Sequence, residues 1–338
     1  MNKKIFAIIP LIIILSFRIF NADGGDGKIL VVTSIGFLES IVKIIGGSRV
    51  EVFSIVPSNI DPHQFTITPE TILKTSKADL IIVDGHIEWE YKLIEQLSKI
   101  KNMDAGKFSI NLMEYKDNMT ILDIPSETGI SGKNYHGYWI LPENVMFMAK
   151  VICNKLVEID PNGVVEYNEN LESFYRKMEI LNDKIIDIKN ENIGVNVVLG
   201  FLAEQYVAYM LGLKIFTVLS LEGGTYPNPR SLEAAYNILK NEGGFIMISD
   251  ISMEMPVYNT IIDLAKQTGA PIIKVMIGAN IDYISMMMYN IGKIEGALTP
   301  ISMEKDYGQI QNIMITIALI IIIVVETTYL YKLKRMIK

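Results

Sequence analysis

The chain alternates strand-like and helix-like segments in two separate regions, and this alternation limits its fold more than any other feature does. In the first region, short apolar runs such as 28–33 and 80–83 each precede a segment with helical periodicity. The same order returns between residues 195 and 298. Strands that alternate with helices form parallel sheets covered by helices. The pattern therefore predicts an α/β fold with two lobes, each built on a parallel, helix-covered sheet.

A long helical stretch separates the two alternating regions. Apolar residues recur at helical spacing over residues 142–159 and again over 164–188. Asp160-Pro161 lies between the two runs. We expect the first helix to end or bend there, because the residue before a proline is biased away from the helical conformation. Continuous helix of this length predicts a rigid connection. We expect an N-terminal α/β lobe over 28–140, a linking helix over 141–188 and a C-terminal α/β lobe over 189–300.

Both ends of the chain are apolar. Residues 1–22 have the basic start and short apolar run of a secretory signal segment. Residues 313–331 are long enough, at roughly 28 Å as a helix, to cross a bilayer core. Basic residues follow directly, which favours a cytoplasmic C-terminus. We therefore expect a C-terminal transmembrane helix that anchors both lobes on the extracytoplasmic face of the cell membrane.

Composition and missing motifs exclude several function classes. A net charge of −7 without a basic stripe argues against nucleic acid as a partner. The single cysteine, Cys153, excludes an intrachain disulfide framework. The chain also lacks a Gly-x-Ser-x-Gly elbow, a phosphate-binding loop and a His-Glu-x-x-His pair. These absences favour a binding protein over an enzyme.

Two of the three histidines stand where a metal ligand is expected. His63 lies on a proline-stiffened loop after the strand-like run 50–56. His136 lies just before the linking helix, beside the aromatic residues Tyr138 and Trp139. Neutral imidazole is a common ligand for zinc and related ions. We predict that both histidines bind a metal ion.

Four further residues are candidate metal ligands, and some of them have an alternative role. Asp250 follows an apolar strand, where an α/β fold places binding groups, and Asp282 either binds the ion or caps the helix after it. Asn196 is weaker, since a carboxamide is a poor metal ligand. His86 ends a strand; we expect a supporting role at the rim, with ligation as the alternative.

Several motifs together resemble the metal-binding receptors of zinc and manganese ABC importers, over roughly residues 28 to 300. The matching motifs are Asp61-Pro62-His63, Thr68-Pro69-Glu70, Lys77-Ala78-Asp79-Leu80, Glu88-Trp89, Pro142-Glu143-Asn144, Leu156-Val157-Glu158-Ile159-Asp160-Pro161 and Pro227-Asn228-Pro229-Arg230-Ser231-Leu232. The resemblance implies two lobes that trap one divalent ion in their cleft and a rigid linking helix that limits their motion. It also implies an ABC permease and its ATPase as partners.

The resemblance further implies a ligand set. In this family, two histidines come from the first lobe, and a histidine or glutamate plus an aspartate come from the second. His63 and His136 match the first two. The third ligand is missing, with Asn196 nearest to its position, and the family's aspartate aligns nearest Ile281, one residue before Asp282. The histidine-rich loop of many zinc receptors is absent.

The leading hypothesis is therefore a membrane-anchored receptor that captures a divalent metal ion as its transported ligand, with zinc favoured and manganese second. The missing third ligand motivates an alternative, in which the same fold has lost free-ion capture and binds a metal chelate or a protein partner. A metal-dependent hydrolase that uses His63, His136 and Asp250 comes third, because no carboxylate is reserved as its general base.

Overall fold

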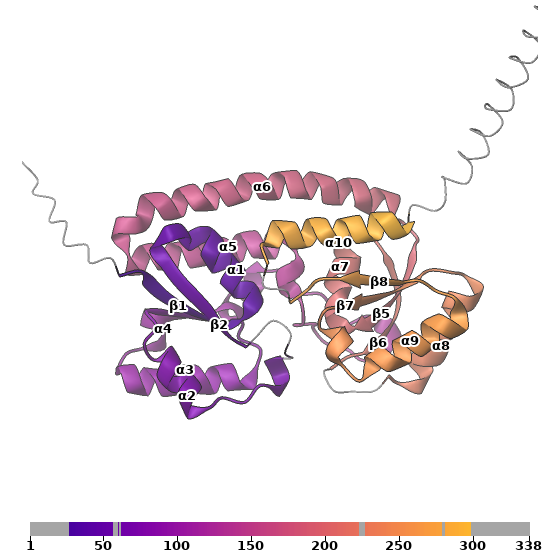
Figure 1. Ribbon diagram of the computed structural model, residues 1–338, viewed down its shortest axis with the longest axis horizontal. Coiled ribbons are helices and arrows are strands. Elements are labelled where there is room, and N and C mark those ends of the chain that lie inside the picture. Colours follow the sequence, from indigo (N-terminus) through magenta and orange to yellow (C-terminus); the bar gives the residue numbers. More distant parts are fainter. Residues whose placement is uncertain (1–26, 57–59, 61, 223–226, 279–280, 299–338) are drawn as a thin grey trace, which may run out of the picture.

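The computed structural model describes residues 27–56, 60, 62–222, 227–278 and 281–298. Two α/β lobes lie side by side, and the long helix α6 runs across both (Figure 1). The elements of the first lobe are β1 (Ile29–Ile35), α1 (Gly36–Gly46), η1 (Gly47–Arg49), β2 (Val50–Val56), η2 (Pro62–Gln64), α2 (Pro69–Thr75), β3 (Leu80–Val83), α3 (Glu88–Lys101), α4 (Ala105–Phe108), β4 (Ser109–Asn111), η3 (Leu112–Asn118), η4 (Ser126–Thr128) and η5 (Tyr138–Ile140), where η marks a 3₁₀ helix.

Two helices connect this lobe to the second one. The connecting elements are α5 (Pro142–Ile159), η6 (Pro161–Gly163) and α6 (Val164–Glu191). The elements of the second lobe are β5 (Asn196–Phe201), η7 (Leu202–Glu204), α7 (Gln205–Met210), β6 (Lys214–Ser220), α8 (Pro229–Asn241), β7 (Phe245–Ser249), η8 (Ser252–Glu254), α9 (Val257–Thr268), β8 (Ile272–Val275) and α10 (Tyr283–Leu298). With 28 residues, α6 is roughly 42 Å long, enough to span both lobes.

Each lobe contains a four-stranded sheet in which every pairing is parallel, with strand orders β2-β1-β3-β4 and β6-β5-β7-β8. The two lobes therefore repeat one topology without a visible sequence repeat. All residues of β3 and β7 are buried, as expected for inner strands covered by helices on both faces. The predicted α/β architecture of two lobes with parallel sheets is confirmed.

Parallel strands place all their carboxyl ends at one edge of the sheet, and this edge positions the functional site. In the first lobe, the segments after β1, β2 and β3 line a cavity. In the second lobe, the end of β5 and the segments after β7 and β8 line the same cavity. The two sheets therefore direct their carboxyl-terminal edges toward a shared space between the lobes.

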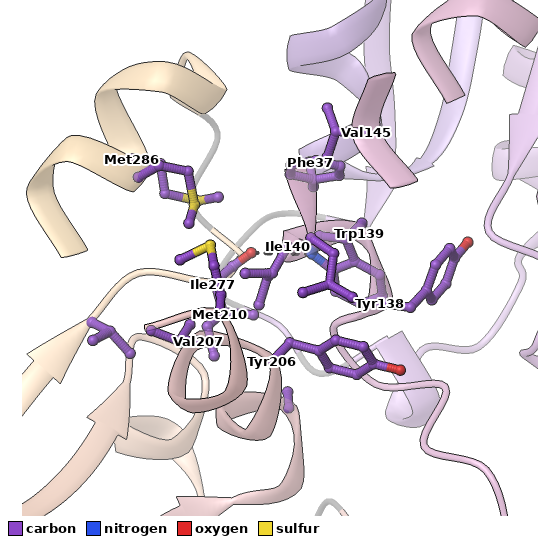
Figure 2. Packing of buried hydrophobic residues seen from close by; sticks show 14 of the residues in the cluster. Phe37, Tyr138, Trp139, Ile140, Val145, Tyr206, Val207, Met210, Ile277 and Met286 are labelled. Carbon is purple, nitrogen blue, oxygen red and sulfur yellow. Dashed lines mark hydrogen bonds between the residues drawn. The ribbon is translucent and has the colours of Figure 1, made fainter. Parts of the chain in front are cut away.

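An apolar core continues from one lobe into the other and holds them together. Figure 2 shows Trp139 and Ile140 packed amid buried side chains of both lobes. The indole Nε1 of Trp139 donates to the carbonyl of Ile277 at 3.3 Å, and the Tyr283 hydroxyl donates to the carbonyl of Ile140 at 2.7 Å. Buried aromatic residues with a satisfied polar atom combine a large hydrophobic contribution with a fixed orientation. These contacts fix the positions of the two lobes relative to the cavity.

One part of the predicted fold class needs correction. We expected a transmembrane helix over 313–331, but no helix among the described residues is long and apolar enough to cross a membrane. The expected span and the expected signal segment over 1–22 both lie outside the described residues. The described fold is therefore two α/β lobes with linking helices and no transmembrane element. β4, a strand of three residues with one buried apolar side chain, has no local pattern that predicts it.

Candidate metal centre

Three histidines converge at the cavity between the lobes. One ligand atom from each of His63, His86 and His136 lies within 4.8 Å of the others. The Nε2 atoms of His63 and His86 are 3.2 Å apart. The ring centroids of His136 lie 4.9 Å from those of His63 and 5.4 Å from those of His86. Within the described part of the chain, these three residues form the group whose geometry suits a metal ion.

Local contacts fix the loops that carry His63 and His136. His63 lies in η2, and the Trp89 indole donates to the carbonyl of Pro62 at 2.9 Å, which ties this turn to α3. The backbone N–H of His136 donates to the Asn134 side chain at 2.8 Å. Gly137 follows with φ of +91°, and a Cβ there would lie 2.8 Å from the carbonyl oxygen of Ala203. Only glycine allows this close approach of the His136 loop to the second lobe.

His86 is oriented by a buried carboxylate. It lies in the loop between β3 and α3, where its Nδ1 hydrogen bonds to the Asp84 carboxylate. The Tyr138 hydroxyl donates to the other oxygen of Asp84 at 2.7 Å. Asp84 and Tyr138 are both fully buried. The Nδ1 atom of His86 is bound to a carboxylate, and its Nε2 atom faces His63. A carboxylate bound to one ring nitrogen commonly orients a histidine whose other nitrogen binds a metal.

The three rings differ in their protonation. Burial, together with the neighbouring His86 and His63, lowers the pKa of His136 to about 3, so this ring is neutral at physiological pH. Burial alone would lower the pKa of His86, but the Asp84 carboxylate outweighs it and raises this pKa above 6.5. His136 therefore offers a lone pair without losing a proton, whereas His86 releases a proton when it binds a cation.

The second lobe presents an apolar wall to the histidines. Phe201, at the end of β5, has its ring centroid 5.6 Å from that of His136. Ala203, Ile251 and Gly278 line the same cavity, whose volume is about 40 Å³. A cavity of this size has room for a small ion together with a few water-sized ligands.

Backbone groups of the second lobe engage the carboxylates of the two acidic candidates. Asp250 accepts hydrogen bonds from the backbone N–H groups of Ile277, at 2.8 Å, and Gly278, and so holds the loop after β8. Asp282 is exposed and accepts from the N–H and hydroxyl of Ser285, as a helix cap does. Among the described residues, neither belongs to a group of potential ligands centred on the histidines.

Asn196 lies at the opposite end of its strand from the cavity. It begins β5, whereas Phe201 ends it, and five strand steps separate the two by roughly 16 Å. The residue of β5 that faces the histidines is therefore Phe201. The sequence patterns gave no indication of Phe201, and for His86 they predicted a supporting role at the rim, with ligation as the alternative. Strand direction was the signal that points to both residues. Phe201 ends β5 and His86 lies just after β3, so each stands at the carboxyl end of a parallel strand, where binding groups gather.

Comparisons with known proteins agree with this arrangement. A family model described as zinc-uptake complex component A, periplasmic (ZnuA) matches residues 31–297. The metal ABC transporter substrate-binding lipoprotein SsaB of Streptococcus sanguinis is 27% identical over 297 residues, which cover 82% of this chain and 92% of SsaB. FimA of Streptococcus parasanguinis, a protein of the same description, is 31% identical over 193 residues, and the match covers 54% of this chain and 60% of FimA.

Solved structures share the fold. A crystal structure of ZnuA superimposes with a TM-score of 0.66 at 22% identity, over 80% of this chain and 99% of that one. The periplasmic zinc-binding protein TroA from Treponema pallidum gives 0.65 at 20% identity, over 80% of this chain and 99% of TroA. The matched family comprises substrate-binding receptors of ABC transporters rather than enzymes. The resemblance seen in the motifs is confirmed, and the chain belongs to the ZnuA family.

Proposed function

We propose that this protein is a receptor that captures one divalent metal ion between its lobes and delivers it to an ABC permease. The convergence of His63, His86 and His136 at the carboxyl ends of the strands carries this proposal. Relatives described as metal ABC transporter substrate-binding lipoproteins support the transport role. They also support a position on the extracytoplasmic face of the cell membrane, with the permease and its ATPase as partners.

The donor set favours zinc as the ion. Tetrahedral zinc binds imidazole nitrogen at about 2.0–2.1 Å, which places two such nitrogens about 3.3 Å apart. The Nε2 atoms of His63 and His86 are separated by 3.2 Å. Imidazole suits zinc, copper, iron and nickel, whereas manganese prefers carboxylate, carbonyl and water oxygens. Manganese, the ion named for PsaA of Streptococcus pneumoniae, is the second candidate, and iron, named for MtsA of Streptococcus pyogenes, is the third.

The size of the cavity favours a bare ion over a metal chelate. Its volume of about 40 Å³ has room for only a few water-sized groups, at roughly 10–15 Å³ each. A chelated metal needs room for the organic ligand as well. The alternative of a receptor that has lost free-ion capture is thus less well supported than direct capture.

Calorimetric titration of the full-length chain with zinc, manganese and iron(II) tests the proposal. We expect one zinc ion per chain at neutral pH. The combined variant His63→Ala/His136→Ala is expected to abolish this binding, whereas Asp282→Ala, which removes an exposed carboxylate, retains it. Absence of stoichiometric binding for all three ions, or unchanged binding by the double-histidine variant, would contradict the proposal.

A further inference from the structure

We propose that a groove along the open edge of the first sheet binds an extended, basic segment of a partner protein, which adds to β4 as a further strand. This groove, named the edge groove below, has a volume of about 650 Å³ and lies mainly between α3, β4 and α5. Among the described residues, those that line it differ from those that line the histidine cavity. The inference therefore goes beyond the proposed function and does not depend on it.

β4 leaves one side of the first sheet unpaired. Among the described strands, it pairs only with β3, and it ends the strand order β2-β1-β3-β4. Successive residues of a strand direct their backbone N–H and C=O groups alternately to the two sides. At least one of its three residues, Ser109, Ile110 and Asn111, therefore presents these groups away from β3. All three residues line the edge groove, which thus contains a short template for strand addition.

Two helices form the walls of the edge groove, one on each face of the sheet (Figure 1). Neighbouring residues of β3 point to opposite faces: Ile81 belongs to the apolar cluster of α3, whereas Ile82 belongs to that of α5. A strand added beside β4 continues the same pleat. Its successive side chains therefore face α3 and α5 in turn.

Each wall offers an apolar side chain and a carboxylate. On α3, the half-buried Ile94 precedes the exposed Glu95. On α5, the half-buried Val151 lies two turns before the exposed Glu158. A long basic side chain places its apolar stem on such a surface while its charged end reaches a carboxylate. Two neighbouring basic residues in an added strand therefore satisfy one wall each.

Charge distinguishes a basic partner from a second copy of this chain. Four carboxylates and one ammonium line the edge groove: Glu90, Glu95, Glu114, Glu158 and Lys155. The ammonium of Lys155 already donates to the carbonyl of Gly106, at 2.7 Å, and to Glu158, at 2.9 Å. A second copy would bring the same carboxylates against this edge, and like charges that face each other across strands are destabilising. A basic segment compensates them instead.

Fluorescence anisotropy of labelled peptides with the full-length chain tests the inference. The probe is Thr-Val-Lys-Arg-Val-Thr, blocked at both ends, because valine and threonine favour an extended backbone. We expect it to bind more tightly than Thr-Lys-Val-Arg-Val-Thr, which places both basic side chains on one face. Thr-Val-Glu-Glu-Val-Thr has the opposite charge and is expected not to bind.

Methylation of backbone nitrogens tests strand pairing itself. Two analogues of the probe carry methyl groups on alternate nitrogens, in the two possible registers. Since only one set of nitrogens faces β4, one analogue should bind at least about tenfold more weakly than the other. Hydrogen exchange at residues 109–111 is expected to slow when the probe is bound.

Variants of the chain test the two walls. Glu95→Gln/Glu158→Gln removes the carboxylates without a change in shape and is expected to weaken binding of the probe by about fivefold or more. Glu233→Gln/Glu242→Gln removes two exposed carboxylates of the second lobe and serves as the matched control, with wild-type affinity expected.

Four results would overturn the inference. They are absence of binding of the probe, equal affinity for the basic and acidic peptides, equal affinity for the two methylated analogues, and unchanged affinity in Glu95→Gln/Glu158→Gln. These assays contain no metal ion, whereas the proposed function is tested by titration with zinc. A failure of one is therefore distinguishable from a failure of the other.

Discussion

The Nε2 atoms of His63 and His86 lie 3.2 Å apart, although the two residues follow different strands of the first sheet. β2 and β3 flank β1 and run parallel to it, so their carboxyl ends meet at the same edge. The sheet itself therefore creates the histidine pair. His136 joins from the loop before the linking helices, and the second lobe places Phe201 beside the His136 ring.

Replacing His86 by alanine is expected to lower zinc affinity by more than about 100-fold. The loss exceeds the 10- to 100-fold that removal of a supporting residue costs, because the variant removes a donor atom. Titration of the full-length chain with zinc measures the effect. An affinity within about threefold of the wild type would show that His86 is not a ligand.

Replacing Asp282 by alanine is expected to leave zinc affinity unchanged and to reduce stability. Its carboxylate accepts the N–H of Ser285 at 2.9 Å at the start of α10. Loss of such a cap costs about 1 kcal/mol in the free energy of unfolding. Denaturant unfolding and zinc titration of the same variant check both parts. A large loss of affinity with unchanged stability would instead support Asp282 as a ligand.

Asp84→Asn is expected to weaken zinc binding by about 10- to 100-fold while the fold is retained. Asparagine has nearly the same shape, but its neutral amide holds the Nδ1 proton of His86 less firmly than the carboxylate does. Nitrogen-15 NMR of the His86 ring reports the tautomer directly. A variant with normal affinity and an unchanged ring tautomer would contradict the assigned role. Tyr138→Phe, which removes one hydrogen bond to Asp84, should have a smaller effect.

Zinc affinity is expected to increase with pH across the neutral range. Although burial opposes it, the Asp84 carboxylate raises the pKa of His86 above 6.5, so zinc must displace a proton from this ring. His136, with a pKa of about 3, remains neutral and releases none. Affinity should therefore fall as pH decreases through the raised pKa of His86. Calorimetry in buffers of different ionisation enthalpy counts the released protons, and a value of zero near pH 6.5 would contradict this assignment.

Glu204→Gln is expected to make the protein more stable than the wild type at neutral pH. Burial raises the pKa of Glu204 from 4.5 to about 7, while its carboxylate accepts the N–H groups of Gly200 and Phe201. Because the folded state binds the proton more tightly than the unfolded state, wild-type stability declines as pH rises from about 4.5 to about 7. The decline attributable to Glu204 is at most roughly 3 kcal/mol.

Urea unfolding at several pH values isolates this contribution as the difference between the wild type and the variant. The difference should grow between pH 5 and pH 7. Glu233→Gln, which changes an exposed glutamate of α8, serves as the matched control and should follow the wild-type curve. Parallel stability curves for the wild type and Glu204→Gln would contradict the raised pKa.

The sequence predicted the architecture well because apolar runs and helical periodicity are local signals. The fully buried strands β3 and β7 stand out as apolar runs, and the predicted helical runs over 142–159 and 164–188 correspond to α5 and α6. By contrast, β4 has three residues and depends on pairing with β3, so no local pattern reveals it.

The site was harder to predict because it depends on which strand ends meet. His63 and His136 stood out by residue type, but the closeness of His86 follows from the pairing of β1 with both neighbouring strands. Asn196 was named because it lies nearest the family's third ligand position, although the direction of β5 places Phe201 at the cavity instead. A match by motif does not show which end of a strand reaches the cavity, whereas the fold places an aromatic ring there.

X-ray absorption spectroscopy of the zinc-loaded, full-length chain tests the central claim most directly, because it reports the number and kind of atoms around the ion. Capture by His63, His86 and His136 predicts three imidazole nitrogens at about 2.0–2.1 Å and one further light atom. The same measurement on His86→Ala should show only two imidazoles. A wild-type spectrum with two or fewer imidazoles, or with five or six oxygen-rich ligands, would contradict the claim.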